Sequence, residues 1–343
     1  MMKHAPRYTH RAITPHWFRV TYPMSDFERI RNRLIRQFGT PDEIRGRWFF
    51  ERGERFPNGL LLMWGSIVGN ENSDMDDEKG ICCIDASGSV LDDMDGHDRI
   101  AFCVEYSLGG KVTRLDIAVD AQHDEGVGLI DKAIESLEAG ELIGSKTWEP
   151  RIKYKSGEVV AYGVNIGARG KEGSGRYVRI YDKGLEQGDS DFGQHERFEV
   201  EFTKDCAAEV ASDVFSMMAG WETRAWCRVN GAVGFLENRD GAHGHRSRRP
   251  VSKWWAEWTA GHSPVTTVPT RVETTLERHT RWLAETVLPT TARLAKAAGV
   301  SFTDALYHLC GPVVKPRKDD RYMRAMLQEW AGFLHERPRI AAT

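Results

Sequence analysis

Three short segments in the middle of the sequence alternate between apolar and polar residues. They are RLDIAVD (114–120), YVRIYDK (177–183) and RFEVEF (197–202). Successive side chains of a β-strand point to opposite faces, so each segment predicts a strand with one apolar and one polar face. If the three strands share a sheet, its apolar face packs against a core. Its polar face then collects carboxylates, two tyrosines, two arginines and a lysine.

This polar face predicts a chemistry. Carboxylates crowded on neighbouring strands repel one another unless a cation lies between them. Asp116 and Glu199, on different strands, suit an oxygen-preferring ion, Mg²⁺ or Mn²⁺. Asp116 and Asp120 lie about 13 Å apart on one strand and cannot chelate one ion together. A tyrosine beside such an ion suits phosphoryl transfer with the phenolic oxygen as nucleophile. Arg179 and Lys183 would bind phosphate oxygens and ease ionisation of the tyrosine. The alternative is an ordinary solvated face with cross-strand Arg–Glu pairs.

The pattern along the chain predicts an α+β fold, with a largely antiparallel central sheet, flanking helices and a helical C-terminal region. We expect a flexible tail over residues 1–15, an α+β catalytic domain over 16–240, a basic linker over 241–250 and helices over 251–343. Strands are expected at 16–21, 47–51, 60–64, 80–86, 112–119, 148–154, 158–165, 176–182 and 197–202. Helices are expected at 25–38, 127–138, 205–218, 251–259, 270–287, 288–298, 301–310 and 321–335.

Composition favours a cytoplasmic protein that binds a polyanion. No apolar run approaches the length of about 20 residues that spans a bilayer, and the first residues lack the apolar segment of a secretory signal. The six cysteines form no C-x-x-C pair, which argues against structural zinc. Residues 221–343 carry 19 Lys and Arg against 12 Asp and Glu, although the whole chain has a net charge of −3. This asymmetry favours an acidic site joined to a nucleic-acid-binding segment.

Two groups of basic residues are candidates for phosphate contacts, and solvated loops are the alternative for both. One group surrounds the glycine-rich turn at 167–175 and the other lies in and just before the basic linker. They are Arg169, Lys171 and Arg176, and Arg239, Arg246, Arg248 and Arg249. Trp254, Trp255 and Trp258 have helical spacing. They suit either a stacking platform for single-stranded DNA or, as the favoured interpretation, core packing.

Several segments occur in a familiar order between residues 16 and 300. They are HWFRVTYP, RLDIAVD, RIYDKG-x-E, RFEVEF, the pair Trp254–Trp255 and HTRWLAETVLPTTARLAKAAG. As a set they resemble the replication initiation factor family (Rep_trans type), the rolling-circle initiators of small plasmids and filamentous phages. The resemblance implies an origin-specific DNA nickase that becomes attached to the 5′ phosphate and leaves a 3′ hydroxyl as primer.

The resemblance also assigns roles to residues. Tyr181 and Lys183 match the tyrosine and lysine of the family's Y-x-K motif, so Tyr181 is the expected nucleophile. The metal-binding carboxylates match Asp116 and Glu199, followed by Asp120 and Glu201. Origin DNA, a host helicase and a host polymerase are the implied partners. A homodimer is expected because termination needs a second tyrosine, and Tyr177 more closely fits an ordinary sheet aromatic.

Some alternatives remain open at the level of sequence. The pair His243 and His245 resembles the metal-binding His-hydrophobe-His of other rolling-circle enzymes, but Gly244 separates them in the basic linker. We therefore expect no metal there. A non-catalytic DNA-binding regulator on the same scaffold is the main competing function. A relaxase or recombinase of a mobile element is another, and metal dependence would argue against a recombinase of the integrase type.

Overall fold

A computed structural model describes residues 8–65, 80–123, 128–169, 174–188, 195–237, 249–267 and 288–302. The chain divides into two compact units, Met1–Pro269 and Thr270–Thr343. In the second unit the described element is helix α10 (Leu288–Ala298), which confirms the helix predicted at 288–298. The predicted helices at 270–287 and 321–335, and nearly all of the one at 301–310, lie outside the described residues. So do positions 241–248 of the basic linker.

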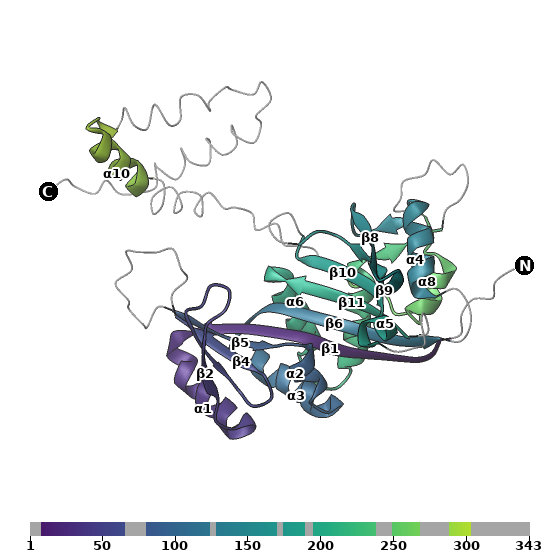
Figure 1. The fold of residues 1–343 in the computed structure, drawn as a ribbon, viewed down its shortest axis with the longest axis horizontal. Helices are drawn as coiled ribbons and strands as arrows, with labels where there is room; N and C mark the ends of the chain where they lie inside the picture. The colour runs from purple at the N-terminus through teal and green to yellow at the C-terminus, as the bar shows by residue number, and fades with distance from the viewer. Residues whose placement is uncertain are drawn as a thin grey trace, which may run out of the picture. The chain divides into compact units, whose positions relative to one another are not determined.

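Among the described residues, ten antiparallel strands of the first unit form one sheet (Figure 1). Their order is β2-β3-β4-β5-β1-β6-β11-β10-β9-β8. The bounds are Tyr8–Pro23 (β1), Asp42–Arg45 (β2), Arg52–Arg55 (β3), Leu61–Trp64 (β4), Ile81–Ala86 (β5), Lys111–His123 (β6), Trp148–Lys155 (β8), Glu158–Ile166 (β9), Arg176–Asp182 (β10) and His195–Thr203 (β11). Strands β7 (Leu142–Ile143) and β12 (Gly234–Phe235) pair separately. The expected α+β class with a largely antiparallel sheet is confirmed.

Helices cover one face of this sheet. They are α1 (Phe27–Phe38), α2 (Gly88–Asp92), α3 (Gly96–Ser107), α4 (Leu129–Glu138), α6 (Lys204–Val214), α7 (Trp221–Ala232) and α8 (Lys253–Trp258). The apolar alternate residues of β6, β10 and β11, such as Ile117, Ile180 and Phe198, are buried with them in one core. A short helix α5 (Lys183–Gln187) follows β10 directly. Within the described part of the chain, no helix is long and apolar enough to span a membrane.

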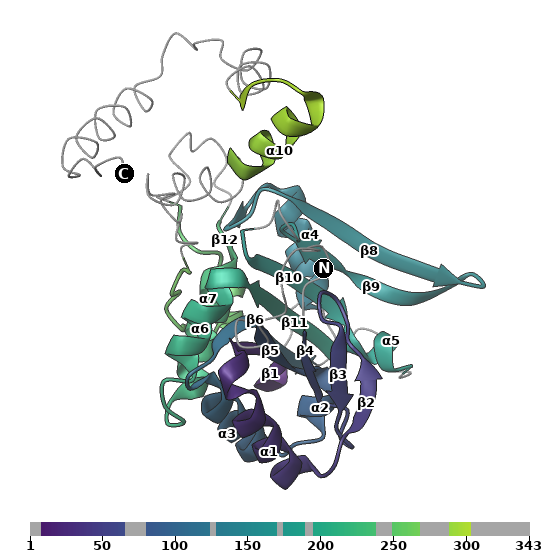
Figure 2. The same cartoon turned by 90° about the vertical axis from the view of Figure 1, so that its left-hand side faces the viewer.

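The opposite face, which we call the polar face, carries the other alternate residues of these strands. In the view of Figure 2, helices α1, α3, α6 and α7 lie to the left of the sheet, and the β2–β3 and β8–β9 hairpins extend to the right. A small apolar cluster of Leu61, Met63 and Cys83, with Ile44 and Phe50 packed against it, attaches the β2–β3 hairpin to this face. The two hairpins therefore flank the polar face at either end of the sheet.

Several sequence predictions are corrected by the structure. Residues 8–15 are not a flexible tail, because they form the first half of β1 and pair with β6 along residues 117–123. The expected strand at 47–51 is instead the turn between β2 and β3. Helix α7 was not predicted at all. The first compact unit continues to Pro269, so α8 belongs to it rather than to a separate helical region.

The core explains the position of α8. Trp255 and Trp258 are 1% and 0% exposed and pack against Phe198 of β11. Trp255 Nε1 also donates a hydrogen bond to Asn230 Oδ1 of α7 at 3.0 Å. The core-packing interpretation of these tryptophans is therefore confirmed, and they are not available as a stacking platform.

Candidate functional site

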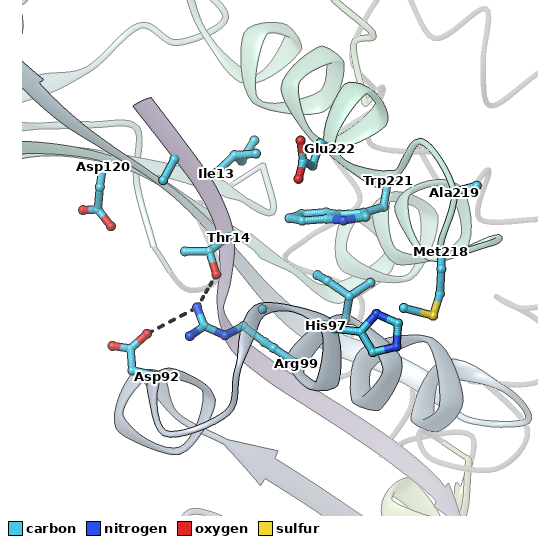
Figure 3. Close-up of a pocket in the computed structure, with 13 residues that line it drawn as sticks. Ile13, Thr14, Asp92, His97, Arg99, Asp120, Met218, Ala219, Trp221 and Glu222 are labelled. Carbon is cyan, nitrogen blue, oxygen red and sulfur yellow. Dashed lines mark hydrogen bonds and ion pairs between the residues drawn. The ribbon is translucent and has the colours of Figure 1, made fainter. Parts of the chain in front are cut away.

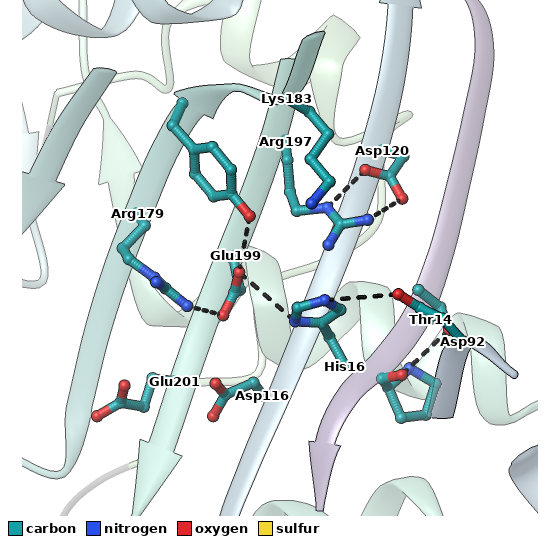
Figure 4. A network of polar contacts seen from close by, with 12 residues as sticks. Thr14, His16, Asp92, Asp116, Asp120, Arg179, Lys183, Arg197, Glu199 and Glu201 are labelled. Carbon is teal, nitrogen blue, oxygen red and sulfur yellow. Dashed lines mark hydrogen bonds and ion pairs between the residues drawn. The ribbon is translucent and has the colours of Figure 1, made fainter. Parts of the chain in front are cut away.

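The three alternating segments lie side by side in the sheet, in the order β6, β11, β10. Their register places Asp116 opposite Glu201, Asp120 opposite Arg197, and Arg197 opposite Tyr181. The condition that these strands share one sheet is met, and their polar residues lie on one face as predicted. Figure 4 shows the resulting network of side chains from four neighbouring strands.

Tyr181 lies near the end of β10, where the strand turns into α5. The sequence produces this turn because Asp182 caps the helix, its side chain accepting a hydrogen bond from Leu185 N at 2.8 Å. The Tyr181 hydroxyl donates to Glu199 Oε2 at 3.3 Å. Burial and the charge of Glu199 raise the pKa of Tyr181 above its ordinary value. The phenol is therefore protonated at neutral pH and needs a base, and Glu199 is in position to accept its proton.

Glu199 is fully buried and yet ionised. Burial opposes its ionisation, but the Arg179 guanidinium outweighs that effect and lowers its pKa. Arg179 donates to Glu199 Oε1, and His16 Nδ1 lies 3.8 Å from Oε2. Glu199 is within hydrogen-bond reach of the phenol, as a general base must be, but its lowered pKa makes it a weak base.

Asp116 is the carboxyl partner of Glu199. It favours the ionised form of Glu199, and both residues are 0% exposed. Burial raises the pKa of Asp116 to about 7, although Arg114 holds both of its oxygens at 2.9 and 2.6 Å. Of the two carboxyl groups, Asp116 takes up a proton more readily than Glu199, which reduces their mutual repulsion.

Asp120 and Glu201 do not join this pair. Asp120 accepts two hydrogen bonds from Arg197, at 2.6 and 2.7 Å. Burial opposes ionisation of Asp120, but these bonds outweigh it and lower its pKa. Glu201 accepts from Arg114 at 3.2 Å and from Arg169 at 2.8 Å. Each of these carboxylates thus has an arginine counter-ion of its own.

His16 is the residue that the alternation pattern missed. The register between β1 and β6 shifts between Pro15 and Trp17, which leaves His16 as the extra residue of a bulge. Bulges re-aim side chains beside functional sites, and here the bulge points the imidazole at Glu199 and Asp92 (Figure 4). Burial lowers the pKa of His16, so the imidazole is predominantly neutral at pH 7.

Three buried nitrogen atoms around Tyr181 have no hydrogen-bond partner among the described residues. They are His16 Nδ1, Arg179 Nε and Arg197 Nη1. Buried polar atoms without a partner are rare in folded proteins and call for an explanation. Two of the three belong to guanidinium groups, so an anionic ligand beside the tyrosine would satisfy them.

The side chains near Tyr181 also show whether the expected divalent cation has enough ligands here. Across the described residues, no three His, Cys, Asp or Glu side chains are grouped closely enough to hold an ion by themselves. The predicted set of four carboxylates does not fit, because Asp120 and Glu201 are engaged elsewhere. Of the four predicted carboxylates, Asp116 and Glu199 remain as ligands for Mg²⁺ or Mn²⁺, although Arg114 already holds both Asp116 oxygens. Mg²⁺ is usually held by one or two carboxylates and completes its shell with water and substrate phosphates.

Of the remaining predicted residues, Lys183 lies within the network of Figure 4. Lys183 begins α5, and its ammonium pairs with Glu186 at 2.6 Å. Arg169 is half exposed and stacks on the Tyr177 ring at 4.3 Å. Arg176 instead reaches Gly231 O of α7 at 3.4 Å. Arg249 precedes α8 in the chain. Lys171, Arg239, Arg246, Arg248, His243 and His245 lie outside the described residues.

Stacked arginine–aromatic pairs extend the polar face toward the β2–β3 hairpin. Arg114 stacks on Trp17 at 4.0 Å, and Arg19 stacks on Trp48 at 3.8 Å. Asp85 joins the two pairs by accepting from Trp17 Nε1 at 2.9 Å and Arg19 Nε at 2.6 Å. Trp48 is 50% exposed at the hairpin turn. No sequence pattern indicated this row, since its members come from separate segments.

A pocket of about 840 Å³ lies at the edge of β1, beside the Asp120–Arg197 pair. Its walls come from Ile13 and Thr14 of β1, from α3 and from the start of α7 with Trp221 and Glu222 (Figure 3). Three carboxylates and one arginine line it, so its charge does not suit a phosphate.

Comparison with known proteins identifies the class of protein that this sheet and its polar face represent. The model of the replication initiation factor family (Rep_trans) matches residues 110–310. The match covers more than half of the chain, and the chain belongs to this family. The expected family is therefore confirmed.

The fold is similar to that of a solved structure. It is the rolling circle replication initiator protein from Geobacillus stearothermophilus, with a TM-score of 0.57 and 16% sequence identity. The alignment covers 75% of this chain and 98% of that chain. No curated protein matches the sequence significantly.

Proposed function

We propose that the chain initiates rolling-circle replication by nicking origin DNA through Tyr181. The observation that carries the proposal is the tyrosine itself, hydrogen-bonded to the ionised Glu199 and flanked by two arginines with unpartnered buried nitrogens. The solved initiator with the same fold is named as a rolling-circle replication initiator, and this agrees with the proposal.

The reaction follows from the positions of these groups. The Tyr181 proton passes to Glu199, and the phenolate oxygen attacks the scissile phosphorus. The bond from phosphorus to the 3′ oxygen breaks, and that oxygen takes up a proton to become the 3′ hydroxyl. Tyr181 is then joined to the 5′ phosphate, which conserves the bond for later rejoining. Arg179 and Arg197 stabilise the charge on the phosphate oxygens, with Lys183 as a further cation.

Asp116 and Glu199 would hold the divalent cation. A bound Mg²⁺ or Mn²⁺ would polarise the phosphate and lower the barrier to attack. Because the protein supplies few ligands, we propose that DNA phosphate completes the coordination. Chelation by EDTA is therefore expected to abolish nicking, and excess Mn²⁺ to restore it.

The rest of the polar face binds the DNA strand that leads to the nick. Trp48 at the hairpin turn offers an exposed ring for base stacking, and the neighbouring arginines offer charge. We further propose that a host polymerase extends the 3′ hydroxyl and a host helicase separates the strands. A second copy of the chain would supply the tyrosine needed at termination.

The test uses supercoiled DNA that carries the gene with its flanking sequence, incubated with the full chain and Mg²⁺ or Mn²⁺. After digestion, mass spectrometry searches for a peptide linked to a nucleotide. We expect the adduct on Tyr181, its loss in Tyr181→Phe, and its retention in the matched control Tyr177→Phe. An adduct on another tyrosine would show that this tyrosine, and not Tyr181, is the nucleophile. Tight binding without any adduct would favour the regulator instead.

A further inference from the structure

The β8–β9 hairpin projects beyond the sheet as a two-stranded ribbon. Strand β9 pairs with β10 only from Gly163 to Ile166, whereas it pairs with β8 from Glu158 to Ile166. Residues 152–162 therefore extend past the last pairing with β10. Isolated two-stranded ribbons are marginally stable in water. The projecting part of this ribbon therefore adds little to the stability of the fold, which points to a role in binding.

The ribbon is exposed and basic. Every residue of β8 after Trp148 is exposed, including Tyr154 at 64% and Ile152 at 49%. Arg151, Lys153 and Lys155 form no ion pair with any described residue, whereas Glu149 accepts a hydrogen bond from Asn165 Nδ2 at 3.0 Å. The positive charges of the ribbon are thus available to a partner.

The ribbon begins beside the proposed nucleophile. Gly163 of β9 lies directly opposite Tyr181, and Arg151 lies opposite Gly163. Lys153 follows two residues further along β8, opposite Ala161. Because side chains alternate along a strand, Arg151 and Lys153 share the face of Tyr181. Neighbouring strands are about 4.8 Å apart, so the Arg151 backbone is only about 10 Å from that of Tyr181.

We propose that this ribbon binds double-stranded DNA that flanks the nicked phosphate, with its basic face along the DNA backbone. The inference rests on the proposed function, since the nick places DNA at Tyr181. A two-stranded β-ribbon fits the major groove, and Arg151, Lys153 and Lys155 complement the phosphates. Pairing with a strand of another protein is disfavoured, because Pro150 and the row of charges interrupt the outer edge of β8.

The test compares two double variants of the full chain. Arg151→Gln with Lys153→Gln removes two charges from the ribbon. Arg36→Gln with Lys253→Gln removes two exposed charges from α1 and α8, on the helical side of the sheet. Affinity for a short mixed-sequence duplex is measured by fluorescence anisotropy over a range of salt concentrations. The slope of log K against log salt should fall by about 1.8 in the ribbon variant, about 0.9 for each lost contact, and stay unchanged in the control.

Two further measurements separate the possible outcomes. Adduct formation on a single-stranded oligonucleotide that contains the nick site should remain at the level of the unsubstituted chain in the ribbon variant. If the unsubstituted chain forms no adduct, the proposed function is overturned, independently of the salt dependence measured for the ribbon variant. A ribbon variant with an unchanged slope would overturn the ribbon proposal. If that variant also self-associates in ultracentrifugation, the charges only protect an edge strand.

Discussion

Gly163 is the residue on which the position of Tyr181 depends most directly. A Cβ atom at Gly163 would lie 2.4 Å from Ile180 O, 2.8 Å from Tyr181 Cβ and 2.9 Å from Tyr181 Cα. All three atoms are fixed by the backbone of β10, so no side chain can turn away to make room. Gly163→Ala is therefore expected to push β9 and β10 apart beside the phenol.

The size of the effect follows from these distances. Relief to an ordinary contact of 3.4 Å requires a movement of about 1 Å at this point. A misplacement of about 1 Å can slow an enzymatic reaction by about 100-fold, which corresponds to about 2.7 kcal/mol of activation free energy. Overpacking of this kind also reduces the free energy of unfolding by about 1–3 kcal/mol.

The assay is the rate at which the covalent Tyr181 adduct forms on a nick-site oligonucleotide, with urea unfolding measured in parallel. Gly96→Ala is the matched control, because a Cβ at Gly96 meets no atom within 4 Å and its backbone is not in the left-handed region. The control is expected to behave like the unsubstituted chain. A folded Gly163→Ala variant that forms the adduct at full rate would refute the link between strand spacing and the nucleophile.

Three further predictions concern stability and binding. Asp120→Asn leaves Arg197 buried without its counter-ion and should lower the free energy of unfolding by about 2–4 kcal/mol. The pKa of Asp120 is lowered in the folded state, so its carboxylate adds its full share to the free energy of unfolding above about pH 5. This share declines as the pH falls through the unfolded pKa of about 3.9 and then through the folded pKa. The free energy of unfolding, measured in urea, should therefore depend less on acid pH in the variant. Trp255→Ala should cost about 3–5 kcal/mol in the same assay, and lost DNA affinity with unchanged stability would contradict its place in the core. Trp48→Ala should weaken binding of a single-stranded oligonucleotide about tenfold at unchanged stability, and equal affinity would remove Trp48 from the DNA path.

Most of the correct predictions came from the alternation of apolar and polar residues along single strands. Because the side-chain period of a strand is two, Asp116, Arg179 and Glu199 could be assigned to one face without knowledge of the fold. The segments also proved to be neighbours in the sheet. The same reasoning predicted that the apolar face of the sheet packs against a core, and the residues of that face are buried.

Relations between strands could not be predicted in this way. Register decides that Asp120 faces Arg197, and a single sequence contains no signal for register between distant strands. The bulge that re-aims His16 breaks the alternation that would have revealed it. Residues 8–15 are predicted as a tail because their sequence, YTHRAITP with its polar residues and proline, lacks the apolar character of a core strand.

Strand β1 has a practical consequence for any attempt to isolate the family region. The family match begins at residue 110, but β1 pairs with β6 over most of both strands, from Tyr8 to Thr21. A fragment starting at residue 110 would expose the long edge of β6 and invite aggregation. It would also lack His16. The part of the chain that defines membership of the family is thus not a part that can be expected to fold by itself, and dissection of this protein should keep the N-terminal strand.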